Sequence, residues 1–272
     1  MCAEEGIMSG PLVIQEFESD AIAVVSLNRP EKRNAMNMDV FRELCGLIEA
    51  TENRPGARVM ILKGMGPVFC SGLDLHEAAD SELVQESAKL LASTLRRVWD
   101  SSLVTIAAVH GAAIAGGAGL AAACDYVLCE QGTRWAFPEV RRGLVPALIG
   151  AVLMKQTNRR LLLDWLLTGR VVSAEELERA GVINWIVPQG QVMAAALKQA
   201  RSVLAGAPGV QRSTKRLLDE LSGQPLARLI DHALADHLAS RSSGEAREGV
   251  RAYFEKREPD WAPGSVRISK VK

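Results

Sequence analysis

This chain of 272 residues has few aromatic side chains, few histidines and no excess of either charge. Lys plus Arg and Asp plus Glu each number 32, and no basic stripe with interleaved aromatics occurs, so we expect no nucleic-acid partner. The sequence contains neither H-E-x-x-H nor G-x-S-x-G, which disfavours a metal site and a serine triad. His232 and His237 do not share a helix face and are expected to be structural or exposed.

Cysteine and long apolar runs are also scarce. The five cysteines are odd in number and lack C-x-x-C spacing, which argues against a disulfide framework and predicts reduced thiols in a cytoplasmic protein. The first residues are acidic and lack the regions of a secretory signal. Residues 103–124 are long enough to raise the question of a membrane span, but His110 and several glycines favour a buried strand and helix.

Apolar periodicity predicts strands that alternate with helices before Gln191 and only helices after it. Ser173 and Glu176 have the spacing of a capping box at a helix start. A shift in composition near Ala205 divides the chain into an α/β core, residues 1–205, and a C-terminal helical region, residues 206–272. The predicted strands are 12–17, 21–27, 59–63, 104–109, 126–129 and 182–187, and the predicted helices before Gln191 include 38–53, 81–99 and 117–124.

Two glycine-rich turns follow predicted strands. Strand 104–109 leads through a glycine cluster into an alanine-rich helix, and strand 59–63 leads into F-C-S-G-L-D-L at residues 69–75. Glycine allows the backbone to bend sharply there and leaves amide groups unpaired. If both turns lie at the same edge of the sheet, the amides of Leu73 and Gly116 converge on one oxygen, as in an oxyanion hole.

Other glycine motifs fit these turns less well. Residues 111–116 lack the Lys and the hydroxyl group of a phosphate-binding loop. Residues 117–122 match G-x-G-x-x-A, but the segment before the next strand is shorter than the ~10 to 12 residues of a βαβ crossover. A nucleotide-binding fold is therefore disfavoured.

Glu139 is the sharpest candidate for a catalytic side chain, in the segment W-A-F-P-E-V-R-R. Its neighbours alone favour a surface glutamate paired with Arg141 or Arg142. The alternative is that the aromatic, proline and aliphatic neighbours partly desolvate the carboxyl group and raise its pKa toward the range of a general base.

Five segments together resemble the crotonase superfamily of enoyl-CoA hydratases and isomerases, in the order and spacing of that family. They are residues 27–36, 69–75, 111–125, 137–146 and 253–261. The resemblance covers nearly the whole chain and implies an α/β fold, the crotonase (ClpP-like) spiral of ββα units with a C-terminal helical trimerisation region. It also implies an acyl-CoA substrate, no cofactor besides the CoA of that substrate, and assembly as a homotrimer or a hexamer built from two trimers.

The resemblance also implies roles for individual residues. The amides of Leu73 and Gly116 hold the thioester oxygen and stabilise an enolate, with Glu139 as the acid/base. Lys32 and Arg33 meet the phosphates and adenine of CoA. Further substrate-binding residues implied by the resemblance are Ala35, Ser71, Gly72, Asp74, Leu75, Gly117, Gly119 and Pro138, and Tyr253 with Lys256, a position that can reach the CoA of a neighbouring subunit.

One position departs from the family pattern. Hydratases of the superfamily usually carry a second glutamate where this chain has Gly119. A single base is enough for Δ3,Δ2-enoyl-CoA isomerisation. The stretch around Glu139 also resembles methylglutaconyl-type hydratases, whose substrates carry a second carboxylate that Arg141 or Arg142 could bind. Hydratase and isomerase both stay open, as does a catalytically silent acyl-CoA-binding protein.

A replacement for the missing acid is a further open question. Asp74, His76 and Glu77 follow the first glycine turn and are the candidates for that role.

Overall fold

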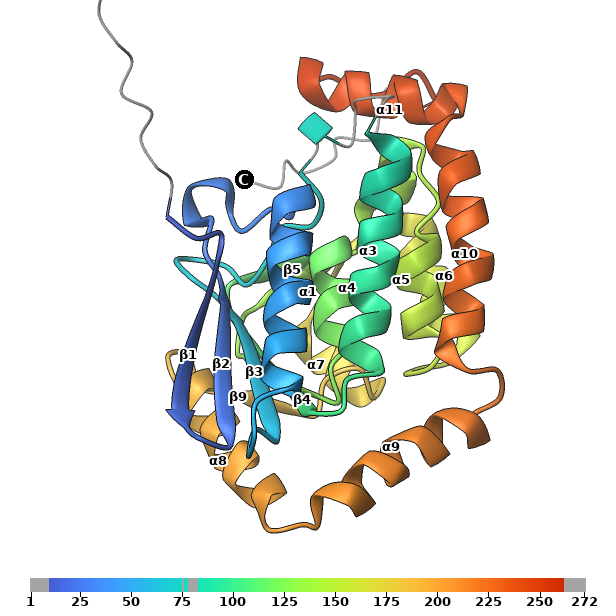
Figure 1. The fold of residues 1–272 in the computed structure, drawn as a ribbon. Coiled ribbons are helices and arrows are strands. Elements are labelled where there is room, and N and C mark those ends of the chain that lie inside the picture. The colour runs from blue at the N-terminus through green and yellow to red at the C-terminus, as the bar shows by residue number, and fades with distance from the viewer. Residues whose placement is uncertain (1–9, 75, 78–82, 262–272) are drawn as a thin grey trace, which may run out of the picture.

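The computed structural model describes residues 10–74, 76–77 and 83–261 (Figure 1). A six-stranded sheet has the order β1-β2-β3-β4-β6-β9, in which β1 is antiparallel to β2 and the other pairs are parallel. A three-stranded sheet has the order β5-β7-β8. The strands are β1 Val13–Ser19, β2 Ile22–Leu27, β3 Val59–Gly64, β4 Val104–Val109, β5 Ala112–Ile114, β6 Tyr126–Glu130, β7 Arg134–Ala136, β8 Val171–Val172 and β9 Trp185–Val187.

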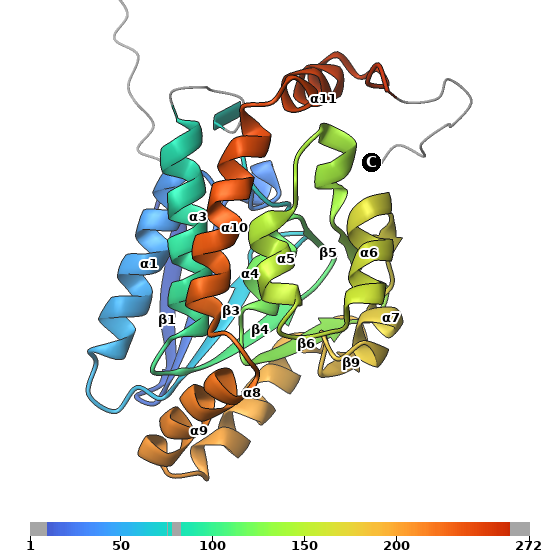
Figure 2. The same ribbon diagram turned by 90° about the vertical axis from the view of Figure 1, so that its right-hand side faces the viewer.

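Helices cover both faces of the larger sheet (Figures 1 and 2). One face carries the layer that contains α1 (Met38–Glu52), α3 (Val84–Trp99) and α4 (Gly116–Ala122). The other face packs against α8 (Val192–Leu204), whose Ala196 and Ala200 are fully buried. Strands β2 and β4 are buried at every position, as expected for strands that are covered on both faces.

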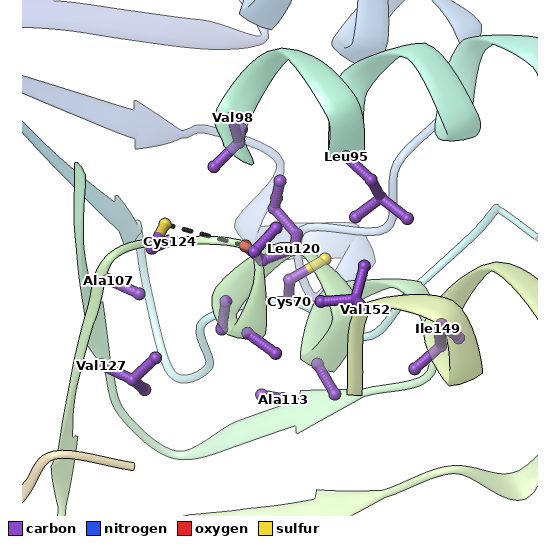
Figure 3. Close-up of a cluster of buried hydrophobic side chains, with 14 of the residues drawn as sticks. Cys70, Leu95, Val98, Ala107, Ala113, Leu120, Cys124, Val127, Ile149 and Val152 are labelled. Carbon is purple, nitrogen blue, oxygen red and sulfur yellow. Dashed lines mark hydrogen bonds between the residues drawn. The ribbon is translucent and has the colours of Figure 1, made fainter. Parts of the chain in front are cut away.

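Helix α4 lies at the centre of the apolar cluster in Figure 3 and approaches its neighbours closely. A Cβ built on Gly117 would lie 2.6 Å from the carbonyl oxygen of Cys70, and one built on Gly119 would lie 3.0 Å from Cγ1 of Ile149. Only glycine leaves room for these contacts. The two glycines therefore fix the position of α4, and with it the position of the turn that precedes the helix.

The C-terminal helices differ in how they pack. Helix α10 (Leu226–Arg241) returns to the core between α3 and α5 (Ala147–Leu153), and Figure 2 shows it beside both. Helix α9 (Pro208–Leu221) has no buried residue, and α11 (Gly244–Glu255) lies against the 3-10 helix η2 (Pro138–Arg142). The exposed apolar residues of α9 are Val210, Leu217, Leu218 and Leu221.

The predicted elements before residue 130 are confirmed within a few residues of their ends. The prediction was incomplete, because the short strand β5 before residue 130, and the strands β7 and β8 and the helices α5 and α6 (Arg159–Thr168) after it, had no predicted counterpart. Strand 182–187 is shorter than predicted and begins at Trp185, because the amides of Val182 and Ile183 donate to the carbonyl of Leu177 at the end of a helix.

Helix α7 (Ala174–Arg179) begins with half of the predicted capping box. The hydroxyl of Ser173 accepts from the amide of Glu176 at 3.2 Å, as predicted. The carboxylate of Glu176 accepts from Nε1 of Trp165 at 2.8 Å and from Arg170. It is thus drawn into a tertiary ion pair. Among the described residues no helix is both long and apolar enough to cross a membrane.

Candidate active site

A cavity of about 330 Å³ opens where the two glycine turns meet the helical layer. Its wall includes the 3-10 helix η1 (Pro30–Lys32), the loop at Leu73, the first residue of α4, Glu139 of η2, and residues of α5 and α10. The cavity therefore collects segments that are far apart in the sequence, at one end of the larger sheet.

The backbone amides of Leu73 and Gly116 lie close together in this wall. A Cβ built on Gly116 would lie 3.8 Å from the nitrogen of Leu73, and a Cβ built on Gly72 would lie 3.4 Å from the nitrogen of Gly116. Met36 bonds to the residues on either side of Leu73, since its amide donates to the carbonyl of Gly72 and its carbonyl accepts from Asp74. Alternation along an extended chain then turns the Leu73 amide away from Met36.

Gly116 is the first residue of α4, so its amide has no acceptor within the helix. The residue before it, Ala115, has φ of 52° and ψ of −125°, a conformation that disfavours any side chain. Strain of this kind costs on the order of 1 to 3 kcal/mol and persists only where the surroundings enforce it. Here the amide of Ala115 donates to the carbonyl of Ala136 at 2.9 Å, which holds the turn in place.

Glu139 presents an unpaired carboxyl group to the same cavity. The residue is 8% exposed, and neither carboxyl oxygen has a hydrogen-bond partner among the described residues. Burial raises the pKa of Glu139 to about 7, while its own backbone amide and the charge of Arg142 act in the opposite direction. The surface ion pair favoured by its sequence neighbours is therefore wrong. Arg141 instead donates to the carbonyl of Thr168 at 2.9 Å.

Basic side chains also line the cavity. Lys32 and Arg33 line it, and the amide of Ser71 donates to the carbonyl of Arg33 at 3.0 Å. The buried amide of Asn34 donates to the carbonyls of Met65 and Val68, at 2.8 and 2.9 Å. These bonds join the loop after β2 to the loop after β3 and so place Lys32 and Arg33 near the loop that carries Leu73.

The cavity brings together many of the residues predicted to bind substrate. Those in its wall are Lys32, Arg33, Ala35, Ser71, Leu73, Asp74, Gly116, Glu139 and Tyr253. Five described residues predicted for the site do not line the cavity, namely Gly72, Gly117, Gly119, Pro138 and Lys256. Leu75 lies outside the described residues.

The three candidates for a second acid lie in different surroundings. Asp74 lines the cavity, but its carboxylate pairs with Arg29 at 3.2 Å. Glu77 accepts from the amide of Met38 at 2.9 Å at the start of α1 and does not line the cavity. His76 lines the cavity and packs against the ring of Phe254, with 5.1 Å between centroids. At Gly119, the usual second position, a side chain would begin in tight contact with Ile149, 3.0 Å from its Cγ1.

Two polar residues of the cavity wall escaped the sequence analysis. His237 and Arg241 of α10 line the cavity and are 6% and 8% exposed. The two residues are four positions apart, and this spacing could have indicated that they share one face of a helix. The expectation that His237 is structural or exposed was too general, because the residue is buried in the wall of the site.

Comparisons with known proteins agree with this architecture. The profile of the enoyl-CoA hydratase/isomerase family matches residues 17–264. A Thermus thermophilus protein assigned to the enoyl-CoA hydratases is 37% identical over 250 residues, which cover 90% of this chain and 98% of that protein. The mevalonyl-coenzyme A hydratase sidH of Aspergillus fumigatus is 33% identical over 258 residues, which cover 92% of this chain and 94% of that protein.

A crystal structure of an enoyl-CoA hydratase from Mycobacterium avium matches with a TM-score of 0.83 at 29% identity, over 93% of this chain and 100% of that one. The α/β architecture with its C-terminal helices is thus the crotonase fold. Together with the family profile, it shows that the chain belongs to the enoyl-CoA hydratase/isomerase family.

Proposed function

We propose that this protein acts on an enoyl-CoA thioester by proton transfer through an enolate, with Glu139 as the only carboxyl acid/base. One observation carries the proposal: the unpaired carboxyl group of Glu139 lines the same cavity as the amides of Leu73 and Gly116. Two fixed N–H donors stabilise an oxyanion in a site that excludes water, and losing one of them typically costs about 3 kcal/mol of barrier.

Hydration is the first candidate reaction, because the relatives described above carry the names of hydratases. The Glu139 carboxylate takes a proton from water while the water oxygen forms a bond to C3 of the enoyl group. The C2–C3 double bond becomes the enolate, whose oxygen meets the two amides. Glu139 then returns the same proton to C2, so one water molecule is added and the carboxylate is regenerated.

Isomerisation is the second candidate, and the packing at Gly119 supports it. A side chain at position 119 would begin 3.0 Å from Cγ1 of Ile149, and with glycine there the usual second acid is absent. Glu139 then takes a proton from C2 of a 3-enoyl thioester and delivers it to C4, and the double bond moves to C2–C3.

The basic side chains of the cavity suit the phosphates of CoA. We propose that Lys32 and Arg33 bind them, and that Tyr253 and Lys256 contact the CoA of a neighbouring subunit, as the family resemblance implies. Tyr253 already lies at the cavity mouth, with the Arg142 guanidinium 4.8 Å from its ring centroid. The described cysteines are all unpaired, which fits the reducing cytoplasm that we propose as the protein's location.

We also propose that the protein assembles as a homotrimer or a pair of trimers through α9, whose apolar side chains are exposed in the single chain. Replacing Leu218 with Glu places charge in that contact and should reduce the mass measured by light scattering. Arg216→Glu, a change at another exposed position of the helix, is the control. An assembly that forms equally well with the Leu218 variant contradicts a contact at this residue.

A panel of 2-enoyl-, 3-enoyl- and 3-methylglutaconyl-CoA, with products followed by mass spectrometry, tests the reaction. A gain of one water identifies hydration, and an unchanged mass with a shifted double bond identifies isomerisation. Binding without turnover of any member identifies a silent acyl-CoA-binding protein. Failure to bind any acyl-CoA contradicts all three functions.

A further inference from the structure

The inner part of the cavity wall carries a pair of buried polar side chains that the proton-transfer steps do not use. His237 and Arg241 lie one turn apart on α10, so their side chains share a face of that helix. Both line the cavity, and both are at least nine-tenths buried. A wall that only had to enclose an alkyl chain would favour apolar residues at these positions.

His237 has unsatisfied hydrogen-bonding groups. Neither Nδ1 nor Nε2 has a hydrogen-bond partner among the described residues. Leaving such a group unpaired in the interior costs about 1 to 3 kcal/mol, so native proteins rarely retain one without a use. Burial and the neighbouring charge of Arg241 lower the pKa of His237 to about 4, while a weaker interaction with the backbone of Val145 acts in the opposite direction. The ring is therefore neutral at physiological pH and can donate one N–H to a bound molecule.

A chain of contacts links this pair to the turn that carries the amide of Gly116. Ser71 bonds to Arg33, and Leu73 lies beside Gly116. A Cβ built on Gly116 would also lie 3.7 Å from Leu91 of α3. Ser87 is one turn before Leu91 on that helix, and its hydroxyl accepts from Nη1 of Arg241 at 3.2 Å. The pair and the two amides thus border the same helix and the same cavity, so we expect an acyl chain that starts at the amides to reach α10.

The hydrogen-bond donors of His237 and Arg241 are suited to binding an anionic oxygen group of a ligand. Arg241 has polar contacts beyond Ser87, and a guanidinium group offers several N–H donors in a fixed plane. Together with the N–H of neutral His237, it presents donors on one helix face. Between this face and the amides, the wall is apolar and includes Leu91 and Leu148. A carboxylate at the end of a short chain satisfies donors of both side chains.

We propose that the acyl group of the substrate ends in a carboxylate, which His237 and Arg241 bind at the α10 wall of the cavity. The inference rests on the proposed function, because it takes the thioester carbonyl to lie at Leu73 and Gly116. Of the two arginines that the sequence suggested, Arg141 is engaged with Thr168 outside the cavity wall. Arg142 does line the cavity, where its guanidinium lies over the ring of Tyr253, so the inference differs from that expectation in placing the carboxylate at α10.

Binding of two unreactive thioesters tests the inference. Glutaryl-CoA and pentanoyl-CoA have the same chain length and differ in a terminal carboxylate or methyl group. Isothermal titration calorimetry on the full-length protein should show tighter binding of glutaryl-CoA, by about tenfold or more. Arg241→Met and His237→Leu should each weaken glutaryl-CoA binding by about tenfold and change pentanoyl-CoA binding little. Arg241→Lys keeps the charge and should lose less affinity for glutaryl-CoA than Arg241→Met does.

Matched controls come from the same helix. Arg228→Met and His232→Leu change exposed positions of α10 and should leave the ratio of the two affinities unchanged. Because both ligands are measured on each variant, a loss of folded protein lowers the active fraction for both and not their ratio. Equal affinity of the unaltered protein for the two thioesters overturns the inference, as does an equal loss for both in the Arg241 and His237 variants.

Failure of the inference and failure of the proposed function give different results. Equal binding of both thioesters, with turnover of enoyl-CoA that depends on Glu139, overturns the carboxylate subsite and leaves the proposed function intact. Tighter binding of glutaryl-CoA, without turnover of any enoyl-CoA in the panel, supports the subsite and contradicts the enzyme. If neither thioester binds, both proposals are wrong.

Discussion

Two walls of the same cavity each bury an ionisable side chain that has no hydrogen-bond partner in the described part of the chain, and they do so with opposite consequences. Glu139 in η2 has its pKa raised to about 7, and His237 in α10 has its pKa lowered to about 4, with burial as the largest cause in both. Both shifts favour the neutral form. The acid is thereby brought into the range in which it can exchange protons, whereas the base is moved out of that range. Burial prepares one wall for proton transfer and the other for hydrogen bonding.

Replacing the acid should have the largest effect. Glu139→Gln keeps the shape of the side chain and removes the proton carrier, so kcat should fall by about 10²- to 10⁴-fold in the mass-detected assay. Acyl-CoA affinity, measured by calorimetry, should stay nearly unchanged. Arg141→Gln, two positions further along η2, is the matched control and should keep kcat. Full activity of the Glu139 variant would contradict the proposal that Glu139 transfers protons in the reaction.

The pH dependence of activity should follow the ionisation of Glu139. Both candidate reactions begin with Glu139 as a carboxylate, so kcat/KM in that direction should rise with pH through about 7. The raised pKa of the free enzyme sets the position of this limb. A profile that is flat between pH 5 and about 8 would contradict the assignment of Glu139 as the base.

The free energy of unfolding should depend on pH in opposite directions for Glu139 and His237. Folded Glu139 retains its proton between about pH 4.5 and 7, so its contribution to folding stability is lost as pH rises through that window. His237 is the reverse, since the unfolded chain binds its proton between about pH 4 and 6.5, and its contribution is lost as pH falls. Each group should change the free energy of unfolding by on the order of 3 kcal/mol.

Urea unfolding at a series of pH values measures these contributions. Relative to the unaltered protein, Glu139→Gln should gain stability as pH rises from about 4.5 to 7, and His237→Leu should gain stability as pH falls from about 6.5 to 4. His232→Leu, at an exposed site of α10, should show neither trend. If the stability of both variants, relative to the unaltered protein, changed with pH in the same direction, the two side chains would not have oppositely shifted pKa values.

Adding a single methyl group at Gly117, at the start of α4, should reduce the stability of the protein. Gly117→Ala places a Cβ within 2.8 Å of three atoms of Cys70, so it should destabilise the protein by about 1 to 3 kcal/mol and shift the amide of the adjacent Gly116. Gly46→Ala in α1, where nothing lies within 4 Å, should instead stabilise by about 0.5 to 1 kcal/mol. Chemical unfolding of both variants makes the comparison, and equal effects would refute close packing of α4.

The smallest expected change concerns the α10 wall at neutral pH. His237→Leu removes a buried imidazole whose nitrogens have no partner, so the ligand-free protein should gain about 1 kcal/mol. Denaturation without ligand measures the gain, and His232→Leu is again the control. A clear loss of stability would mean that His237 is held by favourable interactions and is not kept for a bound molecule.

The sequence predicted much of the fold because the strands before residue 130 carry strong local patterns. Strands β2, β3 and β4 are runs of apolar residues that are typical of a sheet covered on both faces. The short strands β5, β7 and β8 were missed, since segments of two or three residues carry no period. Their geometry depends on pairing with segments that are distant in the chain.

What the sequence determined by itself was the backbone conformation of the glycine turn that precedes α4. Gly116 and Gly117 mark a place where the chain bends sharply and packs closely, a property of glycine that does not depend on the rest of the fold. The family motifs likewise identified Glu139 before its surroundings were known.

Only the tertiary structure decided which charged residues lose water. Local neighbours favoured an exposed Glu139, yet η2 packs beneath α11 and buries the carboxyl group. His237 and Arg241 reach the cavity because α10 returns to the core from the far end of the chain. Desolvation depends on everything within a few ångströms, and most of those atoms belong to residues that are remote in sequence. That is why the second wall of the site could be found only in the folded protein.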